Sequence, residues 1–433
     1  MPHLVPDEQS VRSSVAWNTS SQLLARGIGA LTTFLITLVV ARRFGAQGLG
    51  DFVKITTYLA FFYLIADFGV NAIYLQRTPL PSKTKEPASD TAWEDLLVLR
   101  ICLSGLLVVM AALSLFLLPH GSAQGYTDFV RMGIILFTPS IVFQAIITTA
   151  NALFQKYLRY DMSTIALGIG SVVSVALIYF ITRQSEPVTG VLFAVLALLA
   201  GAAATAGTGL ILTRKFHRIA HSSISFPRVR SLFFASAPLG ITLIFNLIYF
   251  RVDSIILTLT RSTAEVGVYG LAYKVFELFL VFPTFFMNSV YPIMVRTVDR
   301  DQHADKQNFS HLVMRSAVVL GGLSLVATGI FWTAAPIVAW IRSDFAAGVG
   351  AARILALGLP FFFLSSLAMW ILIAKKQQML LVKIYGVSMI VNILLNVLCI
   401  PTYGYTAAAW ITVISEAIVL VMSGVAAIKL LSL

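Results

Sequence analysis

The sequence predicts an all-α membrane protein with twelve transmembrane helices in two six-helix lobes. Three observations carry this prediction: the composition, the length of the uncharged runs and the distribution of basic residues. Hydrophobic residues make up 58% of the 433 residues and charged residues 12%. Soluble domains carry about 45–50% apolar and about 25% charged residues. A chain this apolar has too few polar side chains to cover a surface in water, which favours a polytopic membrane protein.

Long uncharged runs place the predicted helices. Seven stretches contain no Asp, Glu, Lys or Arg, and each exceeds the roughly 18 residues that predict a membrane-spanning helix. These stretches are 101–127, 132–155, 162–182, 187–213, 316–341, 354–374 and 384–415. Apolar runs interrupted by a few charges complete a set of twelve. The predicted spans are 15–41, 50–76, 96–118, 129–153, 162–182, 188–213, 232–260, 266–295, 312–341, 350–374, 379–400 and 405–430.

The basic residues predict how these helices are oriented. When the loops are assigned alternately to two sides, 20 of the 31 Lys and Arg residues fall on the side of both termini and 8 on the other. The remaining 3, Arg26, Arg251 and Lys274, lie further inside the predicted helices, whereas basic residues near a helix end are counted with the adjoining loop. Because cytoplasmic loops carry the excess of basic residues, both termini are expected in the cytoplasm. The same excess explains the net charge of +12 without nucleic acid as a partner.

The most basic loop divides the chain at its midpoint. It covers 214–231, reads RKFHRIAHSSISFPRVRS, and is expected to contact membrane lipids. This predicts an N-terminal lobe over 1–213, a cytoplasmic linker over 214–231 and a C-terminal lobe over 232–433. In each half, the link between the first two helices has an Arg near its start and later a Gly, one residue and an aromatic. These are Gly50-Asp51-Phe52 in the first half and Gly267-Val268-Tyr269 in the second. Secondary transporters are often built from such repeats.

Ionisable residues inside the predicted helices are the candidates for function. A charge within the bilayer costs a few kcal/mol or more, so it usually faces a cavity or a partner. These residues are Arg26, Asp67, Arg251, Asp253, Lys274, Glu277 and Glu416. Lys274 and Glu277 are three residues apart and are expected to pair on one helix face. Arg251 and Asp253 are two apart, so at least one of them needs a partner elsewhere.

Each candidate has a predicted role and an alternative. An arginine fork binds pairs of phosphate oxygens and stays charged, so Arg26 and Arg251 are predicted substrate contacts, or else they hold helices together. Asp253 and Lys274 complete the predicted substrate-binding set. The carboxylates of Asp67, Glu277 and Glu416 are candidates for binding a coupling proton or sodium ion. Packing against polar groups is the alternative for Asp67 and Glu416, and an internal ion pair with each other is the alternative for Lys274 and Glu277.

Metal and cofactor sites are not predicted. The six histidines lie in tails, loops or helix ends, and the helically spaced His217 and His221 have no carboxylate or cysteine close in sequence. The chain also lacks the GxxxxGK[ST] loop that cradles nucleotide phosphates. Transport by this chain would therefore depend on an ion gradient, the membrane potential, the substrate gradient or a separate partner.

Short motifs in both halves carry a resemblance to a known family. They are Arg43-Phe44-Gly45, Gly50-Asp51-Phe52, Asp67-Phe68-Gly69, Arg251-Val252-Asp253, Glu265-Val266-Gly267-Val268-Tyr269, Ala272-Tyr273-Lys274 and Pro292. On these motifs the chain, over about 15–431, resembles the Wzx-type polysaccharide biosynthesis flippases. These belong to a superfamily that also holds multidrug extrusion proteins and peptidoglycan-precursor flippases.

The resemblance implies a fold and a function. It implies two lobes around a V-shaped cavity, alternating access, and a substrate of sugars on a polyprenyl pyrophosphate. That substrate would move out of the cytoplasmic leaflet of a bacterial cytoplasmic membrane, with a sugar polymerase or chain-length regulator as further partners. Arginines in the first and seventh helices line the cavity of related flippases, and Arg26 and Arg251 match those places. One departure is that four intramembrane acids outnumber three cations here.

Two other functions remain open from the sequence. A multidrug or cation antiporter of the same superfamily would need an acid that couples to the drug or ion, such as Asp67 or Glu277. A membrane glycosyltransferase or sugar polymerase would need a sizeable outer loop or a catalytic acidic motif. The predicted outer loops are short, and the longest, around 119–128, has one acid. The short outer loops and the motif resemblance together favour the flippase.

Overall fold

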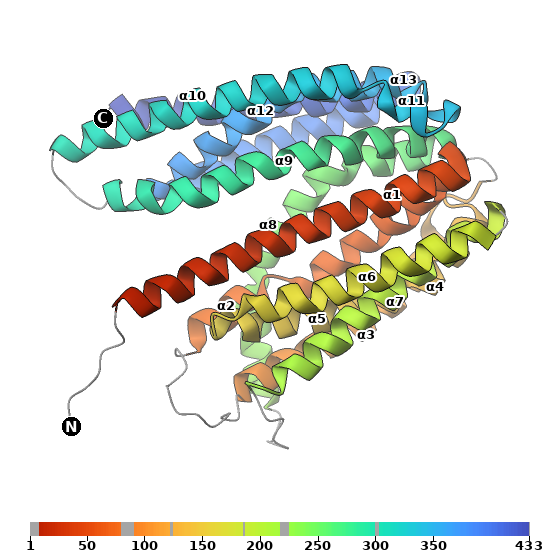
Figure 1. Ribbon diagram of the computed structural model, residues 1–433, viewed down its shortest axis with the longest axis horizontal. Coiled ribbons are helices and arrows are strands. Elements are labelled where there is room, and N and C mark those ends of the chain that lie inside the picture. Colours follow the sequence, from red (N-terminus) through yellow and green to blue (C-terminus); the bar gives the residue numbers. More distant parts are fainter. Residues whose placement is uncertain are drawn as a thin grey trace. The chain divides into compact units, whose positions relative to one another are not determined.

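Helices make up nearly all of the described part of the chain. The computed structural model describes residues 8–78, 91–121, 124–184, 187–216, 225–298 and 303–432 (Figure 1). The first seven helices are α1 (Glu8–Asp67), α2 (Val70–Arg77), α3 (Thr91–Ser114), α4 (Asp128–Phe137), α5 (Ser140–Lys156), α6 (Tyr160–Gln184) and α7 (Pro187–Thr213). The rest are α8 (Phe226–Thr260), α9 (Thr263–Val298), α10 (His303–Ala334), α11 (Ile337–Ile341), α12 (Gly348–Ala374) and α13 (Gln378–Ser432). Short 3-10 turns lie at Leu115–Leu117 and Ser343–Phe345.

The predicted all-α membrane class is confirmed. Within the described ranges, nine helices are long and apolar enough to cross a membrane. Two of these nine, with 61 and 53 residues, have the length of two crossings each, since one crossing needs about 20 residues. Three predicted spans, 50–76, 129–153 and 312–341, are each divided into two helices. The first is broken at Phe68 and Gly69, which both have positive φ. In the other two the reason is proline: Pro139 and Pro336 lack a backbone N–H and stand directly before α5 and α11.

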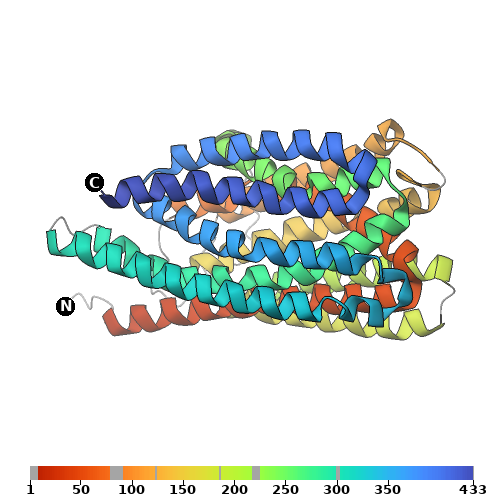
Figure 2. The same cartoon turned by 90° about the horizontal axis from the view of Figure 1, so that it is seen from above.

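Two glycines interrupt the double-length helices. Gly45 in α1 has φ 68° and Gly404 in α13 has φ 62°. This left-handed region disfavours side chains with a Cβ, so glycine is the residue that fits the break. Figure 2 shows the two arms of α13 lying side by side after the break. The predicted boundaries between 41 and 50 and between 400 and 405 thus fall on turns that contain a left-handed glycine.

The chain forms two compact units. Unit 1 comprises 1–43, 54–122 and 126–247, and unit 2 comprises 44–53, 123–125 and 248–433. Helix α8 contributes residues to both units, and the segment Phe44–Val53 from the first half of the chain belongs to unit 2. The cytoplasmic position of both termini stays a prediction. The division into lobes at 213 and 232 stays a prediction as well. Of the predicted linker 214–231, residues 217–224 lie outside the described residues, and 226–231 are not linker but the first residues of α8, which begins six residues before the predicted span 232–260.

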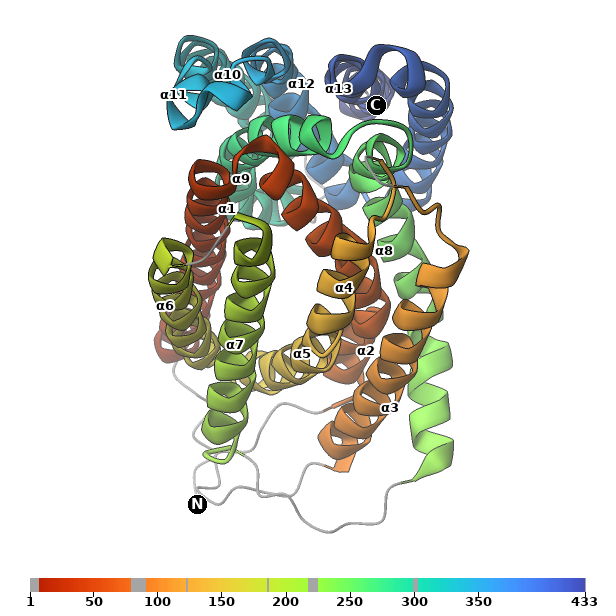
Figure 3. The ribbon, with the colours of Figure 1, turned by 90° about the vertical axis from the view of Figure 1, so that its right-hand side faces the viewer.

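In unit 1, α5 and α7 lie at the centre of the packing. Helix α7 packs beside α4, α5 and α6, and α5 also contacts α2, α3 and α6 (Figure 3). Polar contacts tie α6 to the first arm of α1: the backbone N–H of Tyr160 donates to Asn18 Oδ1 at 2.9 Å. The Thr164 hydroxyl donates to the carbonyl of Ser21, also at 2.9 Å. These bonds hold α1 against α6 at Asn18 and Ser21, shortly before Arg26 in the chain.

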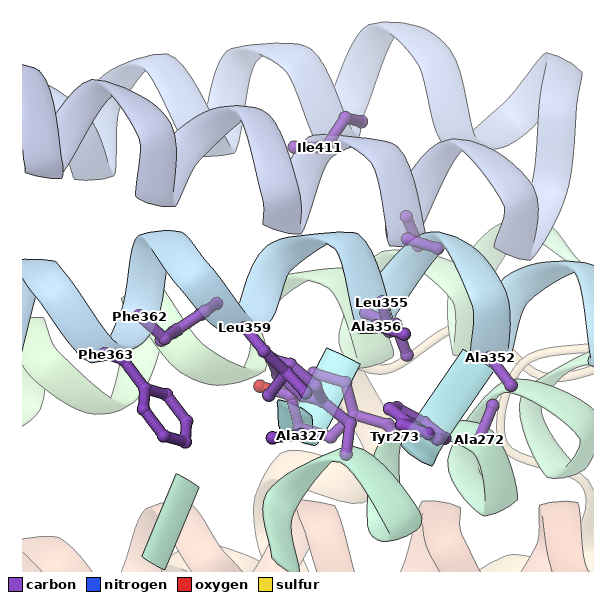
Figure 4. Close-up of a cluster of buried hydrophobic side chains, with 14 of the residues drawn as sticks. Ala272, Tyr273, Ala327, Ala352, Leu355, Ala356, Leu359, Phe362, Phe363 and Ile411 are labelled. Atoms are coloured by element: carbon purple, nitrogen blue, oxygen red, sulfur yellow. The ribbon is translucent and has the colours of Figure 1, made fainter. Parts of the chain in front are cut away.

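In unit 2, α12 lies at the centre of the hydrophobic core. It packs against α9, α10 and α13. Figure 4 shows Leu355, Ala356 and Leu359 of α12 among apolar side chains from the other three helices. Small residues such as Ala352 and Ala356 are fully buried, which lets the helix backbones approach closely. Large apolar side chains such as Trp340 and Leu398 are exposed instead, as expected for a surface that contacts lipid.

Candidate substrate-binding site

Three predicted site residues form one ion cluster in unit 2. Arg251 of α8 and Lys274 of α9 share the carboxylate of Glu277. Arg251 Nη2 lies 3.1 Å from Glu277 Oε1, and Lys274 Nζ lies 2.8 Å from Glu277 Oε2. The pair that the three-residue spacing predicted is therefore confirmed, and Arg251 extends it to a neighbouring helix. One carboxylate pairs with two cations, so these three side chains together carry one positive charge, and the nearby Asp253 carboxylate also interacts electrostatically with Arg251.

The cluster is accessible as well as charged. The side chains of Arg251, Lys274 and Glu277 are 31%, 25% and 27% exposed. Partly exposed cations in an apolar helix can accept a charged ligand without first being extracted from a closed core. A guanidinium and an ammonium that already share one carboxylate can bind a further anion through their remaining N–H donors. The geometry thus suits a negatively charged group.

Asp253 lies outside the ion cluster and within the core. It is 6% exposed, and Asp253 Oδ2 accepts a hydrogen bond from the Tyr269 hydroxyl at 2.6 Å. Its Oδ1 accepts from the backbone N–H of Ser254, also at 2.6 Å. The partner that the sequence required for Asp253 is therefore a tyrosine of α9. Its contacts with Tyr269 and Ser254 place it in the packing of α8 against α9, while its predicted contact with substrate stays a prediction.

The Tyr269–Asp253 bond gives a testable stability effect. Replacing Tyr269 by phenylalanine removes a donor from a buried carboxylate while keeping the ring. We expect the free energy of unfolding to fall by about 2 kcal/mol, since leaving a buried polar group unsatisfied costs about 1–3 kcal/mol. Thermal unfolding of purified protein in detergent measures it. The matched control is Tyr405→Phe, whose hydroxyl donates to the Ala347 carbonyl at an exposed position. Equal midpoints for the two variants would contradict the assignment.

Arg26 lies at a cavity in unit 1. The cavity has a volume of about 180 Å³ and is lined by Ala25, Arg26, Ile147, Ala150, Asn151, Phe154, Tyr160, Ser163, Ala166, Leu167, Thr205 and Gly209. Arg26 has the only ionisable group with a formal charge in this lining, and it makes no hydrogen bond or ion pair with another described residue. Asn151 and Ser163, which hydrogen-bond to each other at 2.6 Å, add polar groups beside it. This cavity offers a free guanidinium and neutral hydrogen-bonding groups.

Asp67 is engaged in an ion pair that the sequence did not reveal. Arg100 Nη2 lies 2.6 Å from Asp67 Oδ1, and Arg100 also donates to the side chains of Asn71 and Thr149. The assignment of basic residues to loops places Arg100 at the cytoplasmic end of the predicted span 96–118, because the uncharged run begins one residue later. The structure instead places Arg100 inside α3 with a side chain that is 0% exposed. Of the seven candidates, Asp67 is thus tied to a structural arginine, and its role in ion coupling stays a prediction.

Glu416 differs from the other two candidates for ion coupling. It is 3% exposed, and its carboxylate accepts hydrogen bonds from the Tyr249 hydroxyl at 3.1 Å and from the Ser365 hydroxyl. Among the described residues, no cation pairs with it. A proton or a sodium ion could bind here without breaking an existing ion pair, whereas Asp67 and Glu277 both face cations. Metal-binding groups of three or more His, Cys, Asp or Glu are absent from the described part of the chain.

Sequence reasoning missed the neutral residues of these sites. Asn151, Ser163 and Thr205 line the Arg26 cavity, and Tyr249 and Ser365 bind Glu416. Each stands in a long apolar run, so a polar residue within an uncharged helix was the signal available. Helical spacing alone does not say which of many such residues meet, because the partners lie far apart along the chain.

Comparisons with known families and structures bear on the whole chain. A family model described as "Polysaccharide biosynthesis protein" matches residues 11–298, and a second, described as MatE, matches 238–398. A search of curated proteins returned no match.

Solved structures share the fold at low identity. The lipid II flippase MurJ, in an inward closed conformation, is similar with a TM-score of 0.72 and 14% identity, over 95% of this chain and 87% of that one. An inward-facing multidrug resistance MATE family transporter of the MOP superfamily gives 0.69 and 12%, over 93% and 94%. A MOP superfamily transporter from Pyrococcus furiosus gives 0.57 and 10%, over 97% and 95%. These likenesses show a shared helical transporter fold.

Proposed function

Because this chain belongs to the polysaccharide biosynthesis protein family, we propose that it is a flippase for a lipid-linked oligosaccharide. Its substrate is a sugar chain on a polyprenyl pyrophosphate, which it moves from the cytoplasmic to the outer leaflet of a bacterial cytoplasmic membrane by alternating access. The similar lipid II flippase also acts on a lipid-linked substrate, as its name states. A sugar polymerase or a chain-length regulator is the proposed downstream partner.

The surplus of positive charge at the candidate site carries this proposal. Arg26 lines a cavity that contains no acid among its lining residues, and the Arg251–Glu277–Lys274 cluster has one cation more than it has carboxylates. A pyrophosphate needs this kind of site, because its oxygens pair with guanidinium forks. Within each unit, the cations therefore suit the charged part of the proposed substrate.

The rest of the substrate explains why a protein is needed. Moving a sugar chain through hydrocarbon strips hydrogen bonds from its hydroxyl groups, at a cost of about 2–7 kcal/mol for each group left unpaired. Neutral polar side chains such as Asn151, Ser163 and Thr205 can replace some of the lost water contacts. The polyprenyl tail loses nothing by staying in the bilayer. A polar site that also carries cations thus removes the largest barriers to transfer.

The antiporter is the second candidate, favoured by the MatE match over 238–398. It would require a carboxylate that meets a cationic drug or a coupling ion. The Arg26 cavity has none among its described lining residues, and Glu277 is already shared by two cations. Glu416 is the carboxylate that fits ion coupling, in either kind of transporter. We also propose that the chain is not a glycosyltransferase or polymerase, since its family and its structural neighbours point to transport.

The proposal is tested by flipping in proteoliposomes. Purified protein is reconstituted with a fluorescent polyprenyl-pyrophosphate oligosaccharide, and the initial rate is compared for wild type, Arg26→Gln and Arg251→Gln. We expect each variant to flip about tenfold more slowly, because one charged hydrogen bond contributes about 1.5–3 kcal/mol and 1.4 kcal/mol is a tenfold change. Arg214→Gln, an exposed arginine beyond α7, is the matched control and should keep the wild-type rate.

Three outcomes would count against the proposal. Full rates in both variants would remove the two arginines from the substrate path. An equal loss in the Arg214→Gln control would point to general surface charge. If wild type fails to flip the lipid but exchanges a cationic drug for protons, the antiporter becomes the better description.

A further inference from the structure

A second cavity lies in unit 1, away from Arg26. Its volume is about 380 Å³, and it is lined by Tyr74, Arg77, Thr78, Ala92, Asp95, Pro227, Arg228, Ser231 and Leu232. These residues come from the end of α2, the start of α3 and the start of α8. The volume is within the range of small-molecule sites, about 300–1,000 Å³. Neither Arg77 nor Arg228 has a role in the proposed transport.

The charges around this cavity are unevenly matched. Arg228 Nε lies 2.5 Å from Asp95 Oδ2, and Asp95 is 3% exposed, so this pair is close to neutral. Arg77 Nη1 makes a hydrogen bond of 3.2 Å to the Ser231 hydroxyl, which carries no charge. Among the lining residues, the cavity therefore has one uncompensated positive charge, on the exposed side chain of Arg77.

The remaining wall is apolar. Tyr74 is 1% exposed and Leu232 is 7% exposed, and Ala92 and Pro227 complete the apolar surface. The Lys156 ammonium lies over the Tyr74 ring, 5.7 Å from its centroid, and makes a cation–π contact with it. An occupant that fits must combine a single negative charge with an apolar part. A free phosphate ion has the charge but no apolar part.

We propose that this cavity binds the phosphodiester headgroup of an anionic phospholipid. The phosphodiester carries one negative charge and accepts hydrogen bonds from Arg77 and Ser231, while the glycerol and the first acyl carbons contact Ala92 and Pro227, the more exposed apolar residues of the lining. The basic-residue bias predicts that this end of unit 1 lies at the cytoplasmic face, where anionic lipids attract basic segments. The site is separate from the substrate contacts at Arg26 and Arg251.

Native mass spectrometry of the full chain tests this proposal. Protein in a neutral detergent is titrated with phosphatidylglycerol or with phosphatidylcholine, and the lipid retained per chain is counted. We expect wild type to retain phosphatidylglycerol preferentially. Arg77→Gln should weaken this retention about fivefold, since one basic residue near an anionic lipid contributes about 1 kcal/mol. Ala92→Phe, which fills the apolar wall and keeps all charges, should weaken it as well.

The matched control is Arg230→Gln. Arg230 lies two residues from Arg228 on α8 but stacks over Phe234, 5.7 Å from the ring centroid, and does not line the cavity. The Arg230→Gln variant should retain phosphatidylglycerol as wild type does.

Equal losses for Arg77→Gln and Arg230→Gln, or equal retention of both lipids by wild type, would overturn the proposal. So would thermal stabilisation by inorganic phosphate alone that disappears in Arg77→Gln, which would assign the site to a free ion. Because Arg77 is exposed, its variant should fold normally, which size-exclusion chromatography checks.

Discussion

Replacing Asp67 by alanine should lower the free energy of unfolding by about 3–5 kcal/mol, because it leaves a buried arginine without its counter-charge. The Arg100 side chain is 0% exposed, and Asp67 contributes both a carboxylate oxygen at 2.6 Å and a backbone carbonyl at 3.2 Å. The hydrogen bonds to Asn71 and Thr149 would remain but do not neutralise the charge. Chemical or thermal unfolding in detergent measures the loss.

The controls for Asp67 distinguish structure from ion coupling. Asp161→Ala removes another Asp–Arg pair of unit 1, but Arg159 and Asp161 are 44% and 18% exposed. An exposed pair contributes about 0–1 kcal/mol, so this variant should unfold nearly as wild type does. The double variant Asp67→Ala/Arg100→Met should recover much of the stability, because it removes the buried charge as well. If Asp67→Ala unfolds as wild type does and loses only transport, the carboxylate acts in coupling and the structural role is wrong.

Replacing Gly267 by alanine should cost about 3 kcal/mol, the upper part of the usual range for overpacking. A Cβ on Gly267 would lie 1.9 Å from the Ala46 carbonyl oxygen, and one on Gly50 would lie 1.9 Å from the Thr263 carbonyl oxygen. Both obstacles are backbone atoms of unit 2, so a side-chain rotation cannot relieve either one. Gly50→Ala should therefore have a similar effect. Thermal unfolding in detergent compares the variants.

Other glycines of unit 2 provide the matched control. Gly386 and Gly424 lie in α13, and a Cβ at either position would meet no atom within 4 Å. Alanine there should leave stability unchanged or raise it by up to about 1 kcal/mol, because alanine is the better helix former. Unfolding midpoints for Gly267→Ala that match those of Gly386→Ala would show that the close approach at Gly267 can relax.

The sequence predicted most of the fold because membrane helices are recognisable from local composition. Uncharged runs of about 20 residues are long enough to cross a bilayer whatever they pack against, so the helices followed from the chain in order. The Lys274–Glu277 pair followed for the same reason, since residues three apart share one helix face. The left-handed turn at Gly404 lies between two predicted spans, although its backbone conformation required the structure.

The site contacts were harder to predict because their partners are distant in sequence. Asp67 and Arg100 are 33 residues apart, and Glu416 lies 167 residues from Tyr249. A single sequence gives the intramembrane charges but not which of them meet. It also did not single out Arg100, which stands directly before an uncharged run near the start of the predicted span 96–118 and whose partner Asp67 is distant in sequence. Apart from Arg26 itself, the residues that line the Arg26 cavity are neutral, so they gave no charge signal.

The segment Phe44–Val53 also has a consequence for how the chain is made. It packs with Thr263 and Gly267, yet Gly50 is synthesised 213 residues before Thr263. At about 5–20 residues per second, the tip of the first helical hairpin waits roughly 10–40 s for these partners to leave the ribosome. Unit 2 therefore cannot be completed during translation of its first residues. Until Gly267 has been inserted, the surface of the nascent hairpin around Ala46 and Gly50 lacks these contacts.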